Sequence, residues 1–189
     1  LGLNNHRLIT LPKTLFRGLI TLKELFLYDN RLTSLDSEIF SGLISLRILH
    51  AMWNHLTELP HNIFHGLSNL FYLNFDSNRI QNLNINIFKG LGNLRLLFLH
   101  NNTLTELEFG ILNDTLNITT LELSWNRLST FPSISHLSHL NFLNLWSNPL
   151  RQVTQNTFHY LPRTVDMYVS QHEICECYVQ NYVNCSAAD

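Results

Sequence analysis

A 24-residue repeat governs this sequence. One unit carries Leu22, Leu25, Leu27, Asn30 and Leu32, which spell LxxLxLxxNxL. Adding 24 to each number reaches equivalent residues in the next unit, and one later unit is two residues shorter. The units begin at Leu22, Leu46, Leu70, Leu94, Ile118 and Leu140. Six units in register exclude chance, so the chain must fold by stacking equivalent turns.

The physical character of each position predicts its structure. Alternation in LxL predicts a short strand with one face turned inward. The asparagine stands where the chain must turn, and its side chain both donates and accepts hydrogen bonds. We expect stacked copies to form a ladder that satisfies buried backbone groups. The predicted ladder residues are Asn30, Asn54, Asn78, Asn102, Asn126 and Asn148.

The second half of each unit repeats a phenylalanine between leucines. The pattern Leu11/Phe16/Leu19 recurs as Leu35/Phe40/Leu43, Leu59/Phe64/Leu67 and Leu83/Phe88/Leu91. These residues predict a second apolar seam behind the sheet, with Phe stacked on Phe. A glycine follows each Phe by two residues, at Gly18, Gly42, Gly66 and Gly90, and predicts a tight backbone position.

The repeat resembles the leucine-rich repeat family over essentially the whole chain. The resemblance implies an α/β solenoid, a horseshoe with a concave parallel β-sheet and a convex side of loops and short helices. We expect about eight repeats over residues 1–174, the first one incomplete. Phenylalanine in the convex half resembles the extracellular subclass, which implies a secreted or cell-surface protein.

The two ends of the chain carry separate expectations. Leu1 lies inside a repeat without a preceding cap, so we expect a fragment that lacks its N-terminal part. Cys175, Cys177 and Cys185 follow the last repeat. Disulfides fit an extracytoplasmic protein, and the odd count predicts a partner beyond Asp189. Zinc is the alternative, but His172 is the only nearby histidine. We interpret residues 175–189 as a truncated cap or hinge.

The segment from Ile174 to Cys185, followed by Ser-Ala-Ala-Asp, resembles a known junction. It is similar to the segment that joins repeats to the membrane domain in leucine-rich-repeat G-protein-coupled receptors, most of all the relaxin-receptor type. It lacks the Asn-Pro that precedes C-x-C in many extracellular caps. The resemblance implies a receptor ectodomain on the extracellular side of the cell membrane. A secreted or matrix adhesion or guidance protein, or an innate immune recognition receptor, stays open.

Repeat geometry identifies 28 residues in and around the strands that face outward. Nine of them are aromatic, where the 11% background predicts about three, five are acidic, and none is Lys or Arg. Exposed aromatic clusters mark interaction surfaces, and Trp and Tyr are frequent hot-spot residues. The predicted ligand-binding residues are Glu24, Phe26, Tyr28, Asp29, His50, Met52, Trp53, Tyr72, Asp76, Phe98, His100, Glu122, Trp125, Phe142, Trp146 and Tyr168.

Acidic residues without basic partners favour a ligand that brings Lys or Arg. We therefore predict a protein or peptide ligand with a basic, partly apolar contact face. The relaxin-receptor resemblance implies the same use of acidic and Trp residues. Two alternatives remain: the aromatic side chains only stiffen the sheet by packing together, or an edge or a missing part holds the site.

Composition and motifs exclude several functions. Twelve Lys and Arg against 14 Asp and Glu give a net charge of −2, so a whole-domain footprint for nucleic acid is absent. No run of 18 apolar residues occurs, so any membrane link lies outside this sequence. HExxH, GxSxG and P-loop motifs are missing, and we expect no enzyme activity, metal site or cofactor. We interpret the ten His as solvated surface residues, although His50 or His100 could give a pH-sensitive contact.

Sequons at Asn101, Asn113, Asn117 and Asn184 are no more frequent than chance predicts. Asn113 and Asn117 fall in a convex segment and are glycosylation candidates. A glycan on Asn101 would stand at the edge of the sheet, where it could block binding.

Overall fold

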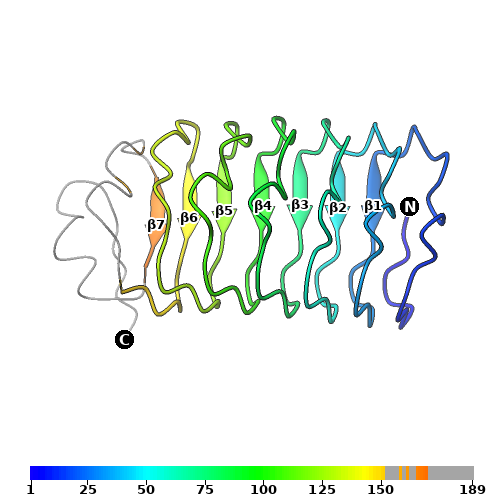
Figure 1. Cartoon of the computed structure of the whole chain (residues 1–189), viewed down its shortest axis with the longest axis horizontal. Helices are drawn as coiled ribbons and strands as arrows, with labels where there is room; N and C mark the ends of the chain where they lie inside the picture. The colour runs from blue at the N-terminus through cyan, green and yellow to red at the C-terminus, as the bar shows by residue number, and fades with distance from the viewer. Residues whose placement is uncertain (152–157, 159–160, 162–164, 170–189) are drawn as a thin grey trace.

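The computed structural model describes residues 1–151, 158, 161 and 165–169. One parallel sheet runs through it, and its strands follow chain order from β1 to β7. Figure 1 shows the strands side by side along the long axis of the molecule. The strands are β1 (Glu24–Phe26), β2 (Ile48–His50), β3 (Tyr72–Asn74), β4 (Leu96–Phe98), β5 (Thr120–Glu122), β6 (Phe142–Asn144) and β7 (Asp166–Tyr168).

The register of the sheet follows the repeat. Leu25 pairs with Leu49 and Leu49 with Leu73, so the middle residue of every strand points into the core. Residues before the first complete unit also pair, because the N–H of Leu3 donates to the carbonyl of Phe26 at 2.8 Å. The predicted leucine-rich-repeat solenoid with a parallel sheet is therefore confirmed.

The convex side consists of turns, and the described residues contain no helix. Of the two predicted forms, loops and short helices, the structure shows the first. Phe16, Phe40, Phe64 and Phe88 are buried as expected, and Phe16 stacks on Phe40 at 6.4 Å and 16°. Leu19 was expected in the seam but is 40% exposed. Its turn has a neighbouring turn on one side only.

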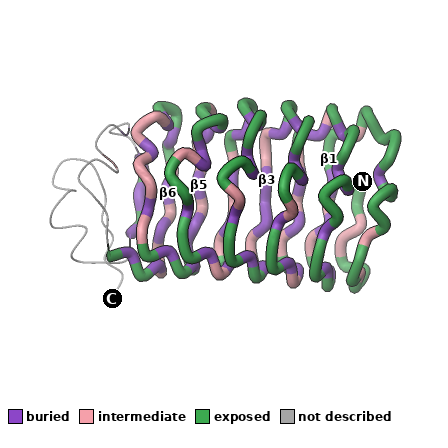
Figure 2. Tube along the Cα trace, viewed as in Figure 1, coloured by how far each residue is buried: buried purple, intermediate pink, exposed green. Residues whose placement is uncertain are grey.

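The ladder asparagines are buried in the interior of the solenoid. Asn54 shows the pattern: its Oδ1 accepts from the N–H of Leu32 at 3.0 Å, and its Nδ2 donates to the carbonyls of Leu27 and Ala51 at 3.0 and 3.1 Å. The same three kinds of bond recur at the later ladder positions Asn78, Asn102, Asn126 and Asn148. Each asparagine therefore ties its own turn to the preceding one. In Figure 2, each coil of the solenoid contains buried stretches, and exposed residues lie on its outer parts.

A second asparagine series links the convex turns. The side chains of Asn69, Asn93 and Asn117 donate to the carbonyls of Ile44, Ser68 and Gly92 at 2.7 to 2.8 Å. These residues are also 24 apart, so the sequence contained the signal. The LxxLxLxxNxL motif does not predict this series, because Asn69 and its equivalents directly precede the first residue of the motif.

The cysteine segment 175–189 lies outside the described residues, so its disulfides and its role as a cap or hinge stay predictions. No helix of the described chain has the length and apolar character that a bilayer crossing requires.

Candidate ligand-binding face

The strands place two residues of each repeat on the outer face of the sheet, called the concave face below. Alternation puts the first and third residue of every strand there, on either side of a buried middle residue. Because the register is regular, third residues such as Phe26, His50 and Asn74 stand beside one another. Side chains far apart in sequence thus form rows across the sheet.

An aromatic cluster covers the first four strands. It consists of Phe26, Tyr28, His50, Tyr72 and Phe98. The His50 ring is the centre, with ring centroids 5.0 Å from Tyr28, 5.7 Å from Tyr72 and 6.4 Å from Phe26. The Tyr72 ring continues the cluster to Phe98 at 5.3 Å. The rings support one another and leave a partly exposed apolar surface.

His50 lies in an apolar setting. Its neighbours on the cluster are uncharged rings, and burial lowers the pKa of its imidazole. Among the described residues, its Nε2 is the one buried side-chain polar atom without a hydrogen-bond partner. This buried nitrogen is left without the hydrogen bond that a buried polar atom usually makes.

A polar network begins beside the aromatic cluster. The Asn74 amide donates to the Tyr72 hydroxyl at 3.0 Å and to Asp76 Oδ2 at 3.2 Å. Asp76 Oδ1 accepts from the backbone N–H of His100 at 2.6 Å. Asn74 Oδ1 also accepts from the Asp76 N–H at 2.8 Å. These bonds hold Asp76 at the border between aromatic and polar surface.

The network continues through a second carboxylate. Glu122 Oε1 accepts from the N–H and the hydroxyl of Ser124, and its Oε2 accepts from Asn144 at 2.9 Å. His100 Nδ1 lies 2.7 Å from the Ser124 hydroxyl. Since that hydroxyl donates its hydrogen to Glu122, His100 Nδ1 must be the donor in this contact. The tautomer of His100 follows from the network.

Asp76 is the most perturbed carboxyl of this face. Burial and the nearby Glu122 charge together raise its pKa to about 7, against the hydrogen bonds from His100 and Asn74, which lower it. An approaching Lys or Arg would favour the charged form of Asp76. Asp76 and Glu122 therefore lie on a face whose strands carry no Lys or Arg.

Three predicted ligand residues stand at the edge of the sheet. Asp29, Trp53 and Trp125 occupy the position before a ladder asparagine, with positive φ values of 53 to 55°. The backbone turns away from the strand there. Trp53 and Trp125 are 54% and 56% exposed, so they do not tuck against a neighbouring turn. Asp29 and Trp53 line a shallow groove along this edge.

The structure brings together most of the predicted site. The outward positions of β1 to β6 form one continuous face, and Phe142 contacts Tyr168 of β7 at 5.6 Å. Asn74 and Ser124, which are two of the 28 residues that repeat geometry predicts to face outward, are buried. They are covered because their side chains bond to neighbours on the face. The side chains of Asn74, Glu122 and Asn144 each accept from the backbone N–H two residues further along the chain.

The glycosylation candidates differ in their surroundings. Asn113 is exposed on a convex turn. The Asn117 side chain donates to Gly92, and the exposed Asn101 side chain donates to Ser77 Oγ at 3.2 Å. Their modification stays a prediction.

Comparison with known proteins agrees with the repeat and the fold. The leucine rich repeat family model matches residues 1–56 and 52–104, more than half of the chain. The chain belongs to the leucine-rich repeat family, a protein-interaction fold that is generally non-enzymatic. Curated proteins gave no match.

Solved structures of the same fold are numerous. The leucine-rich repeat domain of APL1B superposes with a TM-score of 0.77 at 22% identity, over 90% of this chain and 47% of that one. The APL1 domain gives 0.75 at 25% identity, over 79% and 39%. TLR13 in complex with ssRNA13 gives 0.64 at 24% identity, over 86% and 27%. This chain spans less than half the length of these structures.

Proposed function

We propose that the concave face binds a protein or peptide that presents a cationic side chain beside apolar ones. One observation carries the proposal: the aromatic cluster and the carboxyl groups of Asp76 and Glu122 adjoin on a face whose strands carry no Lys or Arg. Rigid aromatic surface gives contact area at low entropic cost, and unpaired carboxylates select a cationic partner.

Each part of the face has a role in this proposal. The rings of Tyr28, His50 and Tyr72 take the apolar contact of the ligand. Asp76 and Glu122 take its Lys or Arg. Because Asp76 is hydrogen-bonded by the His100 backbone, its carboxyl group is already oriented before the ligand arrives.

We further infer that the chain is part of the ectodomain of a cell-surface receptor that signals through a G-protein-coupled membrane domain. The support is the resemblance of the segment after Ile174 to the junction in receptors of the relaxin-receptor type. The ligand would then be a basic, hormone-like peptide on the extracellular side of the membrane.

The ligand proposal is tested with two synthetic peptide libraries of equal length, one mixing Lys, Arg, Leu and Phe and one with Glu in place of the basic residues. We expect binding from the cationic library only. The double variant Glu122→Gln/Trp146→Ala should weaken binding by at least about tenfold. The matched control Glu58→Gln/Phe109→Ala makes the same changes at exposed convex positions and should leave it unchanged. Equal losses in both variants, or preference for the acidic library, would contradict the proposal.

The receptor assignment is tested by sequencing the parent transcript beyond the codon for Asp189. Several apolar runs of about 20 residues would support a membrane receptor. A completed cysteine cap followed by a stop codon or other extracellular modules would leave an adhesion or matrix protein instead.

A further inference from the structure

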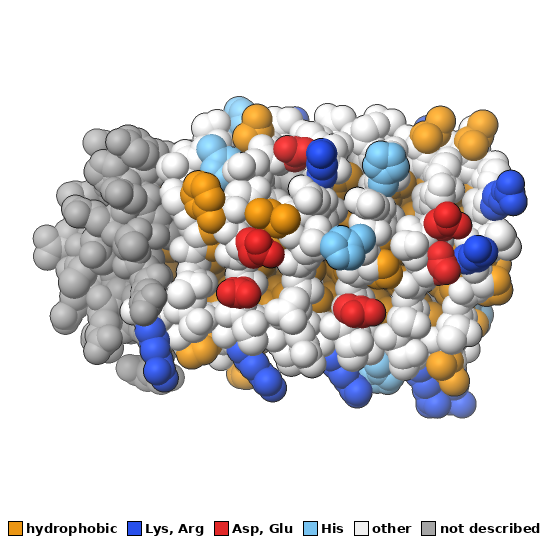
Figure 3. Space-filling view, viewed as in Figure 1, with side chains coloured by type: hydrophobic (Ala, Val, Ile, Leu, Met, Phe, Trp, Pro, Cys, Tyr) orange, Lys and Arg blue, Asp and Glu red, His pale blue; other side chains and the backbone are white. Residues whose placement is uncertain are grey.

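A row of arginines follows the ladder along one edge of the solenoid. The residue after the ladder position is Arg7, Arg31, Arg79 or Arg127 in four repeats, and His55 or Thr103 in two others. All four arginines are exposed. They make up four of the nine arginines of the chain. Figure 3 shows Lys and Arg side chains in a row along one long edge of the molecule.

The backbone holds these arginines in equivalent places. The N–H groups of Arg31, Arg79 and Arg127 each donate to a carbonyl of the preceding turn at 2.8 Å. Their side chains therefore leave the backbone at the same point of the repeat. Successive members of this set are two repeats apart, which corresponds to about 10 Å at the usual spacing of strands.

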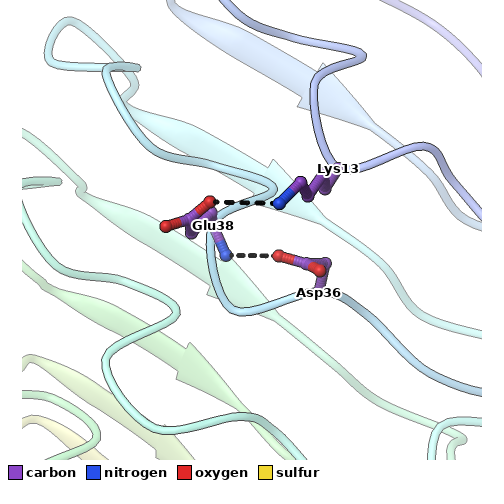
Figure 4. Close-up of polar contacts among 3 residues, drawn as sticks. All are labelled: Lys13, Asp36 and Glu38. Carbon is purple, nitrogen blue, oxygen red and sulfur yellow. Dashed lines mark hydrogen bonds and ion pairs between the residues drawn. The ribbon is translucent and has the colours of Figure 1, made fainter.

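These charges lack acidic partners. Within the described part of the chain, the one ion pair joins Lys13 Nζ and Glu38 Oε2 at 3.9 Å (Figure 4). That pair lies on exposed convex turns, where Asp36 accepts from the Glu38 N–H. A row of like charges without counter-ions is a surface that attracts an extended anion.

The same edge presents one exposed aromatic ring among polar residues. A shallow groove along it is lined by Asp29, Arg31, Trp53, His55, Arg79 and Asn101, among others. Trp53 is 54% exposed and belongs to the repeat between those of Arg31 and Arg79. Arginine binds sulfate through two parallel N–H donors, and an exposed indole can cover the apolar face of a sugar ring.

We propose that this basic edge, formed by Arg7, Arg31, Arg79 and Arg127, binds an extended sulfated polysaccharide. Such a chain carries its sulfate groups in clusters one disaccharide apart, a spacing close to that of two repeats. A nucleic acid strand in a duplex has a charge about every 3.4 Å, so arginines about 10 Å apart would meet only one phosphate in three. Asp76 and Glu122, the carboxyl groups of the proposed ligand site, are not among the residues that line the groove.

The test uses heparin-type polysaccharide as the probe and calorimetry at several salt concentrations as the measurement. The triple variant Arg31→Gln/Arg79→Gln/Arg127→Gln should bind at least about tenfold more weakly, and its salt slope should fall by about two to three. The control Lys23→Gln/Arg47→Gln/Arg95→Gln removes the same charge from exposed residues that immediately precede β1, β2 and β4. The affinity of this control variant for the polysaccharide should fall by less than about threefold, because only the long-range electrostatic attraction changes.

Several outcomes would overturn the proposal. Equal losses in the two triple variants would mean that net charge alone attracts the polysaccharide. Equal binding of the desulfated polysaccharide would remove the role of sulfate. A single-stranded oligonucleotide that binds more tightly at equal charge would assign the edge to nucleic acid. The single variant Arg79→Gln, measured beside a circular dichroism melt, separates a loss of binding from a loss of folding.

Discussion

The two faces of one sheet follow opposite rules. On the inner face, paired positions repeat a single residue type, Leu25, Leu49, Leu73, Leu97, Leu121 and Leu143, before Met167 ends the row. On the outer face, the adjacent row reads Glu24, Ile48, Tyr72, Leu96, Thr120, Phe142 and Asp166, with no two residues alike. One backbone presents both rows.

The difference follows from the surroundings of each row. An inner residue meets the same neighbours in the preceding and following turns, so one side-chain shape fits every repeat. An outer residue meets solvent or a ligand, and the fold does not restrict its identity. If the proposed function holds, the variation along the outer rows sets which ligand the face binds.

The largest expected effect comes from an interior polar residue. Asn78→Ala removes hydrogen bonds to Leu56, Ala51 and Phe75 and leaves buried backbone groups without partners. At about 1–3 kcal/mol for each unpaired group, we expect the free energy of unfolding to fall by about 3 kcal/mol or more. Urea denaturation followed by circular dichroism measures the change.

The control for Asn78 is Asn86→Ala at an exposed convex position. It should change the free energy of unfolding by less than about 0.5 kcal/mol. Similar losses at both positions would show that the interior is not the constrained region.

The comparison of faces also explains how far the sequence could predict this protein. Ladder residues such as Asn54 and core residues such as Leu73 were predictable because their environment repeats every 24 residues. The burial of Ser124 was not predictable, because it depends on the particular side chains of Glu122 and His100 beside it. Ligand binding by the concave face depends on such particular side chains, which do not repeat every 24 residues. The ligand-binding site therefore stays a prediction.

Asp76 is the exception that sharpens the comparison, since it is largely covered although it lies on the outer face. Its pKa is about 7 when folded, against an ordinary value of 3.8. Between these values the folded protein holds a proton that the unfolded chain releases, so stability falls as pH rises from about 4 to 7. The slope is at most about 1.4 kcal/mol for each pH unit.

The variant Asp76→Asn should lose this part of the pH dependence, measured as urea midpoints between pH 4 and 8. Glu24→Gln changes an exposed outward carboxylate and should keep the wild-type slope. A slope unchanged by Asp76→Asn would contradict the burial of this carboxyl group. Glu122→Gln should narrow the pH range over which stability falls, because the Glu122 charge raises the pKa of Asp76.

A smaller change in stability is expected at Gly66, a position where the backbone conformation alone accounts for the repeated glycine. Gly66 has φ of +83°, and a Cβ added there would meet nothing within 4 Å. Gly66→Ala should therefore cost about 1 kcal/mol from backbone strain, without any steric clash. Gly92 lacks a positive φ and its added Cβ would lie 3.9 Å from Asp114 O, so Gly92→Ala should be neutral or slightly stabilising. Thermal melts of both variants decide whether conformation or packing selects glycine here.

The smallest expected change in stability tests whether periodicity or burial makes an asparagine stabilising. Asn93 belongs to a 24-residue series just as Asn78 does, but its side-chain hydrogen bond to the Ser68 carbonyl, at 2.8 Å, lies at the exposed convex surface. When this bond is lost, water can replace the amide, so Asn93→Ala should lower the free energy of unfolding by only about 0.5 kcal/mol. A loss near that of Asn78→Ala in the same urea titration would mean that repetition itself marks the stabilising residues. The expected difference between the two variants instead indicates that burial of the asparagine, and not its periodicity, determines its contribution to the free energy of unfolding.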